Sequence, residues 1–227
     1  AELMNNSHPS EFSECGLDCP VEHVNWSDAV LAANRLSARQ GLEQCYSCSY
    51  SNELDLQTAV CAVAEEFEGQ AIYECEGYRL PTEAEWEFVA RSGVDAYLWT
   101  PSGGGYFSTT SCDEYAYVYD SEETQIASFA WFCGSAAQST HPSAQLEPVE
   151  SEIFDLFGNV GEWCHDSFSS TFPMSEEDPV AEGSSLKIIR GGSWSSSPAD
   201  LGVGERAYLG QLSRHDTVGF RLVRTSD

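Results

Sequence analysis

The part of this sequence best suited to chemistry is a hydroxyl-rich run inside a segment bounded by arginine and glycine. Residues 190–224 read RGGSWSSSPADLGVGERAYLGQLSRHDTVGFRLVR. Within it, Ser196 is the middle of three consecutive serines. A serine becomes a nucleophile when a neighbouring base takes its proton. The sequence places no histidine beside Ser196, so we interpret these serines as solvated loop residues.

The interior of the same segment carries side chains suited to binding. A tyrosine, two arginines and a histidine stand among small residues, a mixture typical of adaptable recognition surfaces. The sequence therefore predicts a ligand surface over residues 195–217, against the alternative of a loop that only packs on the core. The candidate ligand-binding residues are Ser196, Arg206, Tyr208, Arg214 and His215.

Four arginines fall inside recognisable motifs, namely Arg79, Arg190, Arg206 and Arg221. A guanidinium presents a rigid fork that pairs with carboxylates and carbonyls. We expect these side chains to hold loops in place, because a chain rich in irregular backbone must satisfy many polar groups. The alternative, for Arg206, is a clamp on an anionic ligand.

The nine cysteines indicate an oxidising compartment. Zinc is the competing explanation, because Cys45 and Cys48 have ligand spacing, but no second C-x-x-C follows and no histidine is near them. We therefore expect disulfides rather than a zinc site. The disulfide candidates are Cys15, Cys19, Cys45, Cys48, Cys61, Cys75, Cys112 and Cys133.

The spacing of the cysteines suggests local pairing without fixing it. Cys15 with Cys19, and Cys112 with Cys133, are reasonable pairs. The four cysteines between these two pairs form a set that would staple the loop between two helices, and their connectivity stays open. Cys164 is left over, and we expect it to be a buried, inert thiol.

The formal net charge is −27, from 37 acidic and 10 basic residues. Such a surface excludes a nucleic-acid partner, because it offers no cluster of cations for phosphate groups. It suits secretion or a salty medium that screens self-repulsion. No apolar run approaches the roughly 20 residues that a membrane span needs. We expect a secreted or cell-surface protein without a membrane span.

Two helices and several short strands must position these residues. The first helix is predicted from a Ser27 cap to about Gln40, with Gly41 as the stop. The second begins at the Thr82 and Glu85 capping box and closes at Gly93. Strands are predicted over 116–119, over 128–133, in KIIRGGSW and in TVGFRLVR. The order of these elements predicts a single α+β domain with small antiparallel sheets and much irregular loop.

Three motifs stand in order along the chain: GYRLPTEAEWEFVARSG, DLFGNVGEWCHD and RGGSW…GFRLVR. Together with VEHVNWSDAVLAANRLS they resemble the formylglycine-generating enzyme family, the sulfatase-modifying-factor domain. The resemblance covers residues 3 to 224 and implies a variant of the C-type lectin-like fold. It also implies that residues 1–227 form one domain that lacks its N-terminal segment, which processing removes or a second chain supplies.

The enzymes that this chain resembles bind copper through two cysteines in the RGGSW segment. Those positions hold Ser196 and Leu201 here. Neither side chain is a thiolate, which Cu(I) selects, so the resemblance implies no copper and no copper-dependent oxidation. Other branches keep the fold and display ligands. We therefore expect a catalytically inactive recognition or structural module that binds a protein or glycan through residues 195–217.

Two alternatives remain beside this expectation. The first is an enzyme of the family whose chemistry does not depend on the cysteine pair. The second is a subunit of an extracellular assembly, in which neighbouring subunits cover the acidic surface.

The resemblance also implies a calcium site in DLFGNVGEW. Its ligands would be the side chain of Asp155, the backbone carbonyls of Gly158 and Val160, and the carboxylate of Glu162. Calcium takes several oxygen ligands, and two carboxylates offset its charge. The alternative is a helix-capping carboxylate and a surface glutamate.

Overall fold

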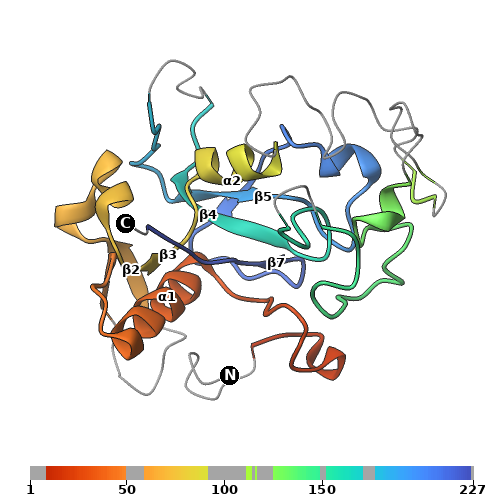
Figure 1. Cartoon of the computed structure of the whole chain (residues 1–227), viewed down its shortest axis with the longest axis horizontal. Helices are drawn as coiled ribbons and strands as arrows, with labels where there is room; N and C mark the ends of the chain where they lie inside the picture. Colours follow the sequence, from red (N-terminus) through yellow and green to blue (C-terminus); the bar gives the residue numbers. More distant parts are fainter. Residues whose placement is uncertain are drawn as a thin grey trace.

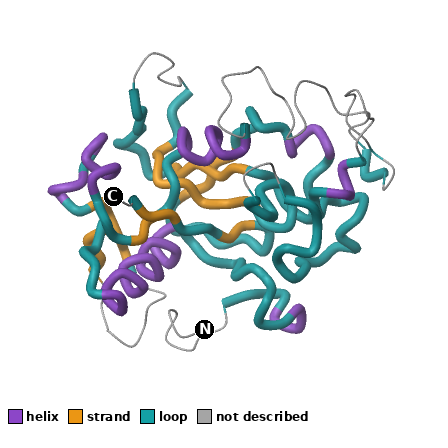
Figure 2. The backbone as a smooth tube through the Cα atoms, viewed as in Figure 1, coloured by secondary structure: helices purple, strands orange, loops and turns teal. Residues whose placement is uncertain are grey.

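The computed structural model describes residues 9–49, 59–91, 111–113, 116, 125–148, 152–170 and 177–225. Two α-helices, short 3-10 turns and short strands alternate with long irregular segments (Figures 1 and 2). The helices are α1 (Trp26–Gln40) and α2 (Glu83–Ala90). The strands are β1 (Tyr46–Ser49), β2 (Val60–Val63), β3 (Tyr78–Arg79), β4 (Gly161–Ser167), β5 (Leu186–Arg190), β6 (Ala207–Gly210), β7 (Val218–Gly219) and β8 (Val223–Arg224). The predicted α+β class is confirmed.

The largest sheet has the strand order β6-β5-β4-β7. Its β6-β5 and β5-β4 pairs are antiparallel, as predicted, whereas β7 runs parallel to β4. Two further antiparallel pairs, β1 with β2 and β3 with β8, form separate small sheets. All seven residues of β4 are buried, because this strand lies inside the sheet and is covered on both faces.

The two faces of the large sheet pack against different helices. Ile189 belongs to a core cluster with Trp26 of α1, while its neighbour Ile188 belongs to a cluster with Trp86 of α2. This alternation follows from the two-residue period of a strand. Figure 1 shows α2 running beside β4 and β5, with α1 on the other side near β2 and β3. The sheet therefore separates two hydrophobic clusters.

The helix boundaries correct one prediction and confirm another. Asn25, not Ser27, caps α1. Its side-chain oxygen accepts a hydrogen bond from the Asp28 backbone N–H, and the Asp28 carboxylate accepts one from the Asn25 backbone N–H. Ser27 lies in the first turn, where its hydroxyl accepts from the Cys61 N–H. The predicted Ser27 cap was wrong because Asn and Ser are both good capping residues, and only Asn25 has the extended backbone that a cap requires. Gly41 ends α1 in a left-handed conformation, as predicted.

At α2, the predicted capping box is present with both of its hydrogen bonds, between Thr82 and Glu85. The helix ends at Ala90, and the predicted stop at Gly93 lies outside the described residues. An eight-residue helix is too short to be stable alone, so α2 depends on its contacts with the rest of the protein.

Two strand predictions are wrong and one cannot be judged. Residues 128–133 form no strand: a 3-10 turn (Ile126–Ser128) precedes them, and only Trp131 makes an isolated bridge, to Gly158. The backbone N–H groups of Phe129 and Ala130 donate to the Ile126 carbonyl in local turns, so they are not available to a partner strand. The predicted strand over residues 217–224 is split into β7 and β8, because β7 pairs with β4 and β8 pairs with β3 in a separate sheet. Residues 117–119 lie outside the described part.

Four disulfides bind the described chain. The expected pairs Cys15–Cys19 and Cys112–Cys133 are present. The connectivity that the sequence left open is nested: Cys48–Cys61 joins β1 to β2 directly, and Cys45–Cys75 closes a longer loop around it. The remaining cysteine, Cys164, is a buried free thiol, and burial raises its pKa well above the ordinary value. Among the described residues, no helix has the length and apolar character of a membrane span.

The disulfide pattern predicts the thiol content of the purified protein. The denatured chain without reductant should expose one reactive thiol, that of Cys164, because the other eight cysteines are oxidised. A thiol-reactive dye in guanidinium measures this directly, with the reduced chain giving all nine as the control. A count near nine without reductant would contradict the disulfide assignment.

Candidate functional site

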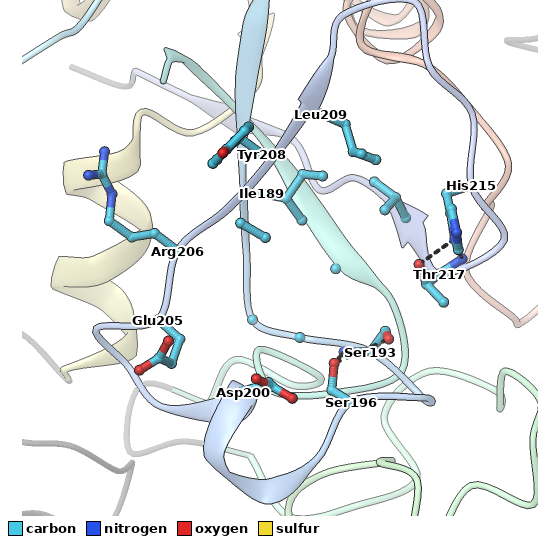
Figure 3. Close-up of a pocket in the computed structure, with 15 residues that line it drawn as sticks. Ile189, Ser193, Ser196, Asp200, Glu205, Arg206, Tyr208, Leu209, His215 and Thr217 are labelled. Atoms are coloured by element: carbon cyan, nitrogen blue, oxygen red, sulfur yellow. Dashed lines mark hydrogen bonds between the residues drawn. The ribbon is translucent and has the colours of Figure 1, made fainter. Parts of the chain in front are cut away.

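A cavity of about 350 Å³ opens where the RGGSW segment meets β6 and the loop before β7. Ile189, Leu209 and Val218 give it an apolar floor, and hydroxyl, carboxylate and imidazole groups stand around it. Figure 3 shows Ser193, Ser196, Asp200 and Glu205 along one side and His215 and Thr217 on another. We call this cavity the sheet-edge pocket.

Two consecutive glycines allow the backbone to turn tightly beside this pocket. Gly191 and Gly192 both have positive φ, 92° and 68°. A Cβ on Gly191 would lie 2.6 Å from the Leu156 carbonyl oxygen, and one on Gly192 would lie 2.7 Å from the Leu201 side chain. Only glycine fits these positions without moving the backbone. The GG of RGGSW is therefore a requirement of the turn below the pocket.

The hydroxyls of the serine run stabilise a tight turn. The Ser196 hydroxyl accepts from the Ser193 N–H at 3.0 Å and lies 3.4 Å from the Ser193 hydroxyl. The Ser196 N–H donates to the Ser193 carbonyl at 3.0 Å. Ser196 lines the pocket, so it can also contact a ligand. Its hydrogen bonds hold the loop and pair it with no basic side chain.

Leu201 is a core residue, although its position in the sequence predicts a surface loop. Its side chain is 0% exposed and belongs to the core cluster with Trp86 and Ile188. The second copper-ligand position of the resembled enzymes therefore holds a packed hydrocarbon in this protein. A short 3-10 turn (Pro198–Leu201) carries it into the core and presents Asp200 to the pocket.

Three further candidates line the pocket, and one of them is already engaged elsewhere. Tyr208 is 48% exposed and lies against Phe168, with ring centroids 4.0 Å apart. The His215 imidazole contacts the Thr217 hydroxyl at 2.7 Å and the Asp216 carboxylate at 2.9 Å. Arg206 points toward α2, away from His215 (Figure 3), and binds the Glu83 carboxylate with two nitrogens, at 2.5 and 2.7 Å.

Arg214 is not part of the pocket. Its guanidinium binds both carboxylate oxygens of Asp28 and the His23 carbonyl, so it fixes the segment before β7 to the start of α1. Its prediction as a ligand residue rests on the mixture of Tyr, Arg and His side chains among small residues in this segment. The structure separates Arg214 from His215, because the buried Asp28 carboxylate binds Arg214, whereas His215 lines the pocket.

Two carboxylates that the sequence analysis did not single out, Asp200 and Glu205, line the pocket. Asp200 accepts from the N–H and hydroxyl of Ser197, at 3.1 and 2.7 Å. None of the ion pairs between described residues involves Asp200 or Glu205, whereas the guanidinium on the lining, that of Arg206, is neutralised by Glu83. The pocket therefore has negative character. Their position inside the predicted 195–217 surface is the sequence feature that could have identified them as pocket residues.

The motif arginines form a framework around α2, as expected from their fork geometry. Arg79 binds Glu85 with two nitrogens, at 2.6 and 2.8 Å. Arg190, whose side chain is fully buried, contacts the carboxylates of Glu83 and Glu87. Together with the Arg206 pair, these contacts tie three separate segments to one helix.

Arg221 makes the fourth connection, to β4. It contacts both oxygens of the Glu162 carboxylate at 2.6 Å, and Trp86 of α2 donates to the same carboxylate at 2.7 Å. Burial lowers the pKa of the Arg221 guanidinium, but the charge and hydrogen bonds of Glu162 outweigh this effect, so its pKa is raised. Arg221 is therefore a fixed cation.

Three of the four residues expected to bind calcium, Asp155, Val160 and Glu162, line a cavity of about 270 Å³ together with Arg221, whereas Gly158 does not. Gly158 has a φ of 73°, consistent with the tight turn expected there. Asp155 accepts from the Ala144 N–H at 2.7 Å with one oxygen. The oxygens fit calcium in type, but Arg221 already neutralises Glu162. Within the described ranges, no group of three or more His, Cys, Asp or Glu side chains is placed to hold a metal ion.

The sequence motifs and this arrangement agree with a known family. The family model for the sulfatase-modifying factor enzyme 1-like domain matches residues 4–226. The chain belongs to this family. Its relatives include the chaperone protein LppX of Paenibacillus barcinonensis, 29% identical over 96% of this chain and 73% of that protein. The formylglycine-generating enzyme of Streptomyces coelicolor is 33% identical over 52% of this chain, which spans 36% of that enzyme.

Solved structures show the same fold. Treponema denticola variable protein 1 superimposes with a TM-score of 0.72 at 27% identity, covering 99% of this chain and 79% of that one. CarF gives a TM-score of 0.61 at 26% identity, over 93% of this chain and 70% of that one. The formylglycine-generating-enzyme type of C-type lectin-like fold, predicted from the motifs, is thereby confirmed.

The arginine framework predicts that neutralising a buried carboxylate lowers the free energy of unfolding much more than neutralising an exposed one. Glu83→Gln should reduce the free energy of unfolding by about 3 kcal/mol, because it removes the charge of a buried carboxylate that binds Arg206 with two hydrogen bonds and also contacts Arg190. Asp216→Asn, which removes an exposed partner of His215, should cost less than about 1 kcal/mol. Urea unfolding of both variants measures the contrast. Equal losses would show that the Glu83 pairs do not hold the framework.

Proposed function

We propose that this protein is a non-catalytic recognition module that binds a protein or glycan partner through the sheet-edge pocket and the surrounding 195–217 surface. The proposal rests on the residues at two positions of the 190–224 segment, Ser196 and Leu201. Leu201 is packed in the core and Ser196 holds a turn, so the two positions that carry copper ligands in the resembled enzymes serve structure here. The cavity beside them remains accessible and has varied polar groups.

The lining favours a ligand with basic or hydroxyl groups. Asp200 and Glu205 can accept hydrogen bonds or pair with cations, and Tyr208 presents a half-exposed ring on which a sugar face or an aliphatic stem can pack. An anionic ligand is disfavoured, because Glu83 engages Arg206. The net charge of −27 acts in the same direction at longer range.

The location we propose is extracellular. Four disulfides support an oxidising compartment, since such bonds rarely persist in the cytosol. Relatives carry names as different as chaperone and variable protein. This variety supports a scaffold on which binding surfaces change while the fold stays, although the partner of this chain is set by its own pocket.

Pocket variants test the proposed recognition. In a screen of glycans and extracellular proteins, Tyr208→Ala should weaken binding of a captured partner about tenfold, the effect of losing one central aromatic contact. Leu212→Ala is the matched control, because Leu212 is 55% exposed in the same segment but does not line the pocket. Isothermal titration measures both affinities. If the two variants bind alike, the partner contacts another surface.

We also propose that Asp155 and Glu162, with the carbonyls of Gly158 and Val160, hold a calcium ion beside the Arg221 anchor. The cavity that Asp155, Val160 and Glu162 share supports this proposal, and calcium would supply a fixed charge that orders the turn. Its role would be structural, since it lies at the arginine framework and its residues do not line the sheet-edge pocket.

Calcium binding predicts a change in thermal stability. A ligand present at a hundred times its Kd adds about 2.7 kcal/mol to the native state, or roughly 5 to 10 °C in Tm for a chain of this length. EDTA should remove this increment, and Asp155→Asn should abolish the response to calcium, while Asp216→Asn should keep it. An unchanged Tm after EDTA treatment of the original protein would contradict the site.

A further inference from the structure

The chain contains one lysine, Lys187, against 37 acidic residues, and its place in the fold is unusual. Lys187 lies in β5 and is only 6% exposed. Its ammonium nitrogen lies 4.3 Å from the centre of the Trp26 ring and donates to the His165 carbonyl at 2.9 Å. The Ser167 hydroxyl is 3.4 Å away. Lysine is rarely buried unless a charge partner accompanies it.

No such partner contacts it in the part of the chain that the structure describes: none of the ion pairs there involves the Lys187 nitrogen. The arginines behave differently, since Arg79, Arg190, Arg206 and Arg221 each meet a carboxylate. The strand period explains the contrast. Arg190 points to the face that packs on α2 with its glutamates, whereas Lys187 points to the opposite face, where Trp26 covers it.

Lys187 also lines a cavity, separate from the sheet-edge pocket. This second cavity has about 360 Å³ and lies between β2, the segment before β5 and the loop after β6. Its wall combines the Trp26 ring with side-chain hydroxyl, amide and carboxylate groups. The polar residues of the wall are Ser167, Ser184, Ser185, Gln211, Glu68 and Glu182. A buried amine thus stands at a cavity large enough for a small polar molecule.

Burial of the amine favours its neutral form. Burial lowers the pKa of the Lys187 ammonium to about 8, against the charges of Asp166 and Glu182, which raise it. His165, whose pKa burial and Lys187 hold well below the ordinary value, is neutral and adds no charge. At pH 7.5 roughly a quarter of Lys187 would be free amine, compared with about one part in a thousand for an exposed lysine. Free amine is the form that attacks carbonyl carbon.

We propose that Lys187 is the nucleophile of a second site, which forms an imine with a small uncharged hydroxyaldehyde that enters this cavity. The hydroxyl and amide groups of the wall match the hydroxyls of such a molecule. Glu68 and Glu182 on the wall disfavour an anionic aldehyde or keto acid. The site is independent of the sheet-edge pocket, and neither proposal needs the other.

The reaction balances without a further reagent. The Lys187 nitrogen adds to the carbonyl carbon and gives up one proton, while the carbonyl oxygen takes one up, which gives a carbinolamine. That oxygen takes up a second proton and leaves as water, while the nitrogen loses its other proton as the C=N bond forms. Glu182 is a carboxylate on the same wall and can carry these protons.

The single lysine makes this proposal direct to test. The intact protein is incubated with glyceraldehyde and cyanoborohydride at pH 7.5, which reduces the imine to a stable amine, and the adduct is located by peptide mass mapping. Every side-chain amine adduct must lie at Lys187, and the chain's α-amino group serves as the internal reference. We expect Lys187 to react at least tenfold faster in the folded protein than in urea. Equal or slower reaction in the folded protein would overturn the proposal.

Two variants and a titration separate reactivity from folding. Lys187→Arg keeps the cation over Trp26 and should give the α-amino adduct alone with a similar Tm. Ser185→Trp narrows the cavity and should slow the Lys187 adduct at least fivefold; an unchanged rate would show that aldehyde does not enter there. With 13C-labelled lysine the protein gives one side-chain signal. It should titrate near pH 8, and a midpoint near the ordinary lysine value would contradict the proposal.

Discussion

The fold depends on the pairing of arginines with the carboxylates of one short helix. Glu83, Glu85 and Glu87 occupy alternate positions of α2 and bind arginines from three separate segments. Such buried pairs add little net stability compared with an apolar core, but each is costly to break. Their main effect is therefore specificity. A chain with long irregular segments acquires one arrangement because a misplaced loop would leave a buried guanidinium or carboxylate unpaired.

This framework also explains what surrounds the sheet-edge pocket. Arg190 and Arg206 fix the two ends of the loop that carries the serine turn, while Arg214 fixes the chain before β7 to the start of α1. The groups that face the pocket are not needed to hold these ends. Binding residues and scaffold residues are thus neighbours in the sequence with different roles. The same separation leaves Lys187 on the opposite face of β5, beyond the reach of the carboxylates of α2.

Much of the fold could be predicted from local signals. The Thr82 capping box, the stop at Gly41 and the glycine turn after Arg190 each depend on a few neighbouring residues, and all three are present. Two of the errors have a common physical cause. The break between β7 and β8 and the separation of Arg214 from the pocket depend on partners distant in the sequence.

The candidate site shows the same limit. The 195–217 segment could be identified as the surface, because its ends match motifs and its interior does not. The side chains that face the cavity could not be predicted from the sequence. Arg206 and Tyr208 are only two residues apart, yet Glu83 binds Arg206 while Tyr208 is half-exposed. The fully buried position of Leu201 likewise results from a short turn whose direction only the packed core determines.

The disulfide map divides the protein into two parts with different responses to the redox potential of their surroundings. All four bonds lie between Cys15 and Cys133, and the following stretch, which contributes most of both cavities, contains only the buried thiol of Cys164. A reductant would therefore loosen the amino-terminal part while leaving every covalent bond of the carboxy-terminal part intact. A proteolytic cut between Cys48 and Cys61 would leave both ends attached, whereas a cut after Cys133 would leave fragments joined by packing alone. Durability against proteases is thus built into one part of the chain by cross-links and must come from burial in the other.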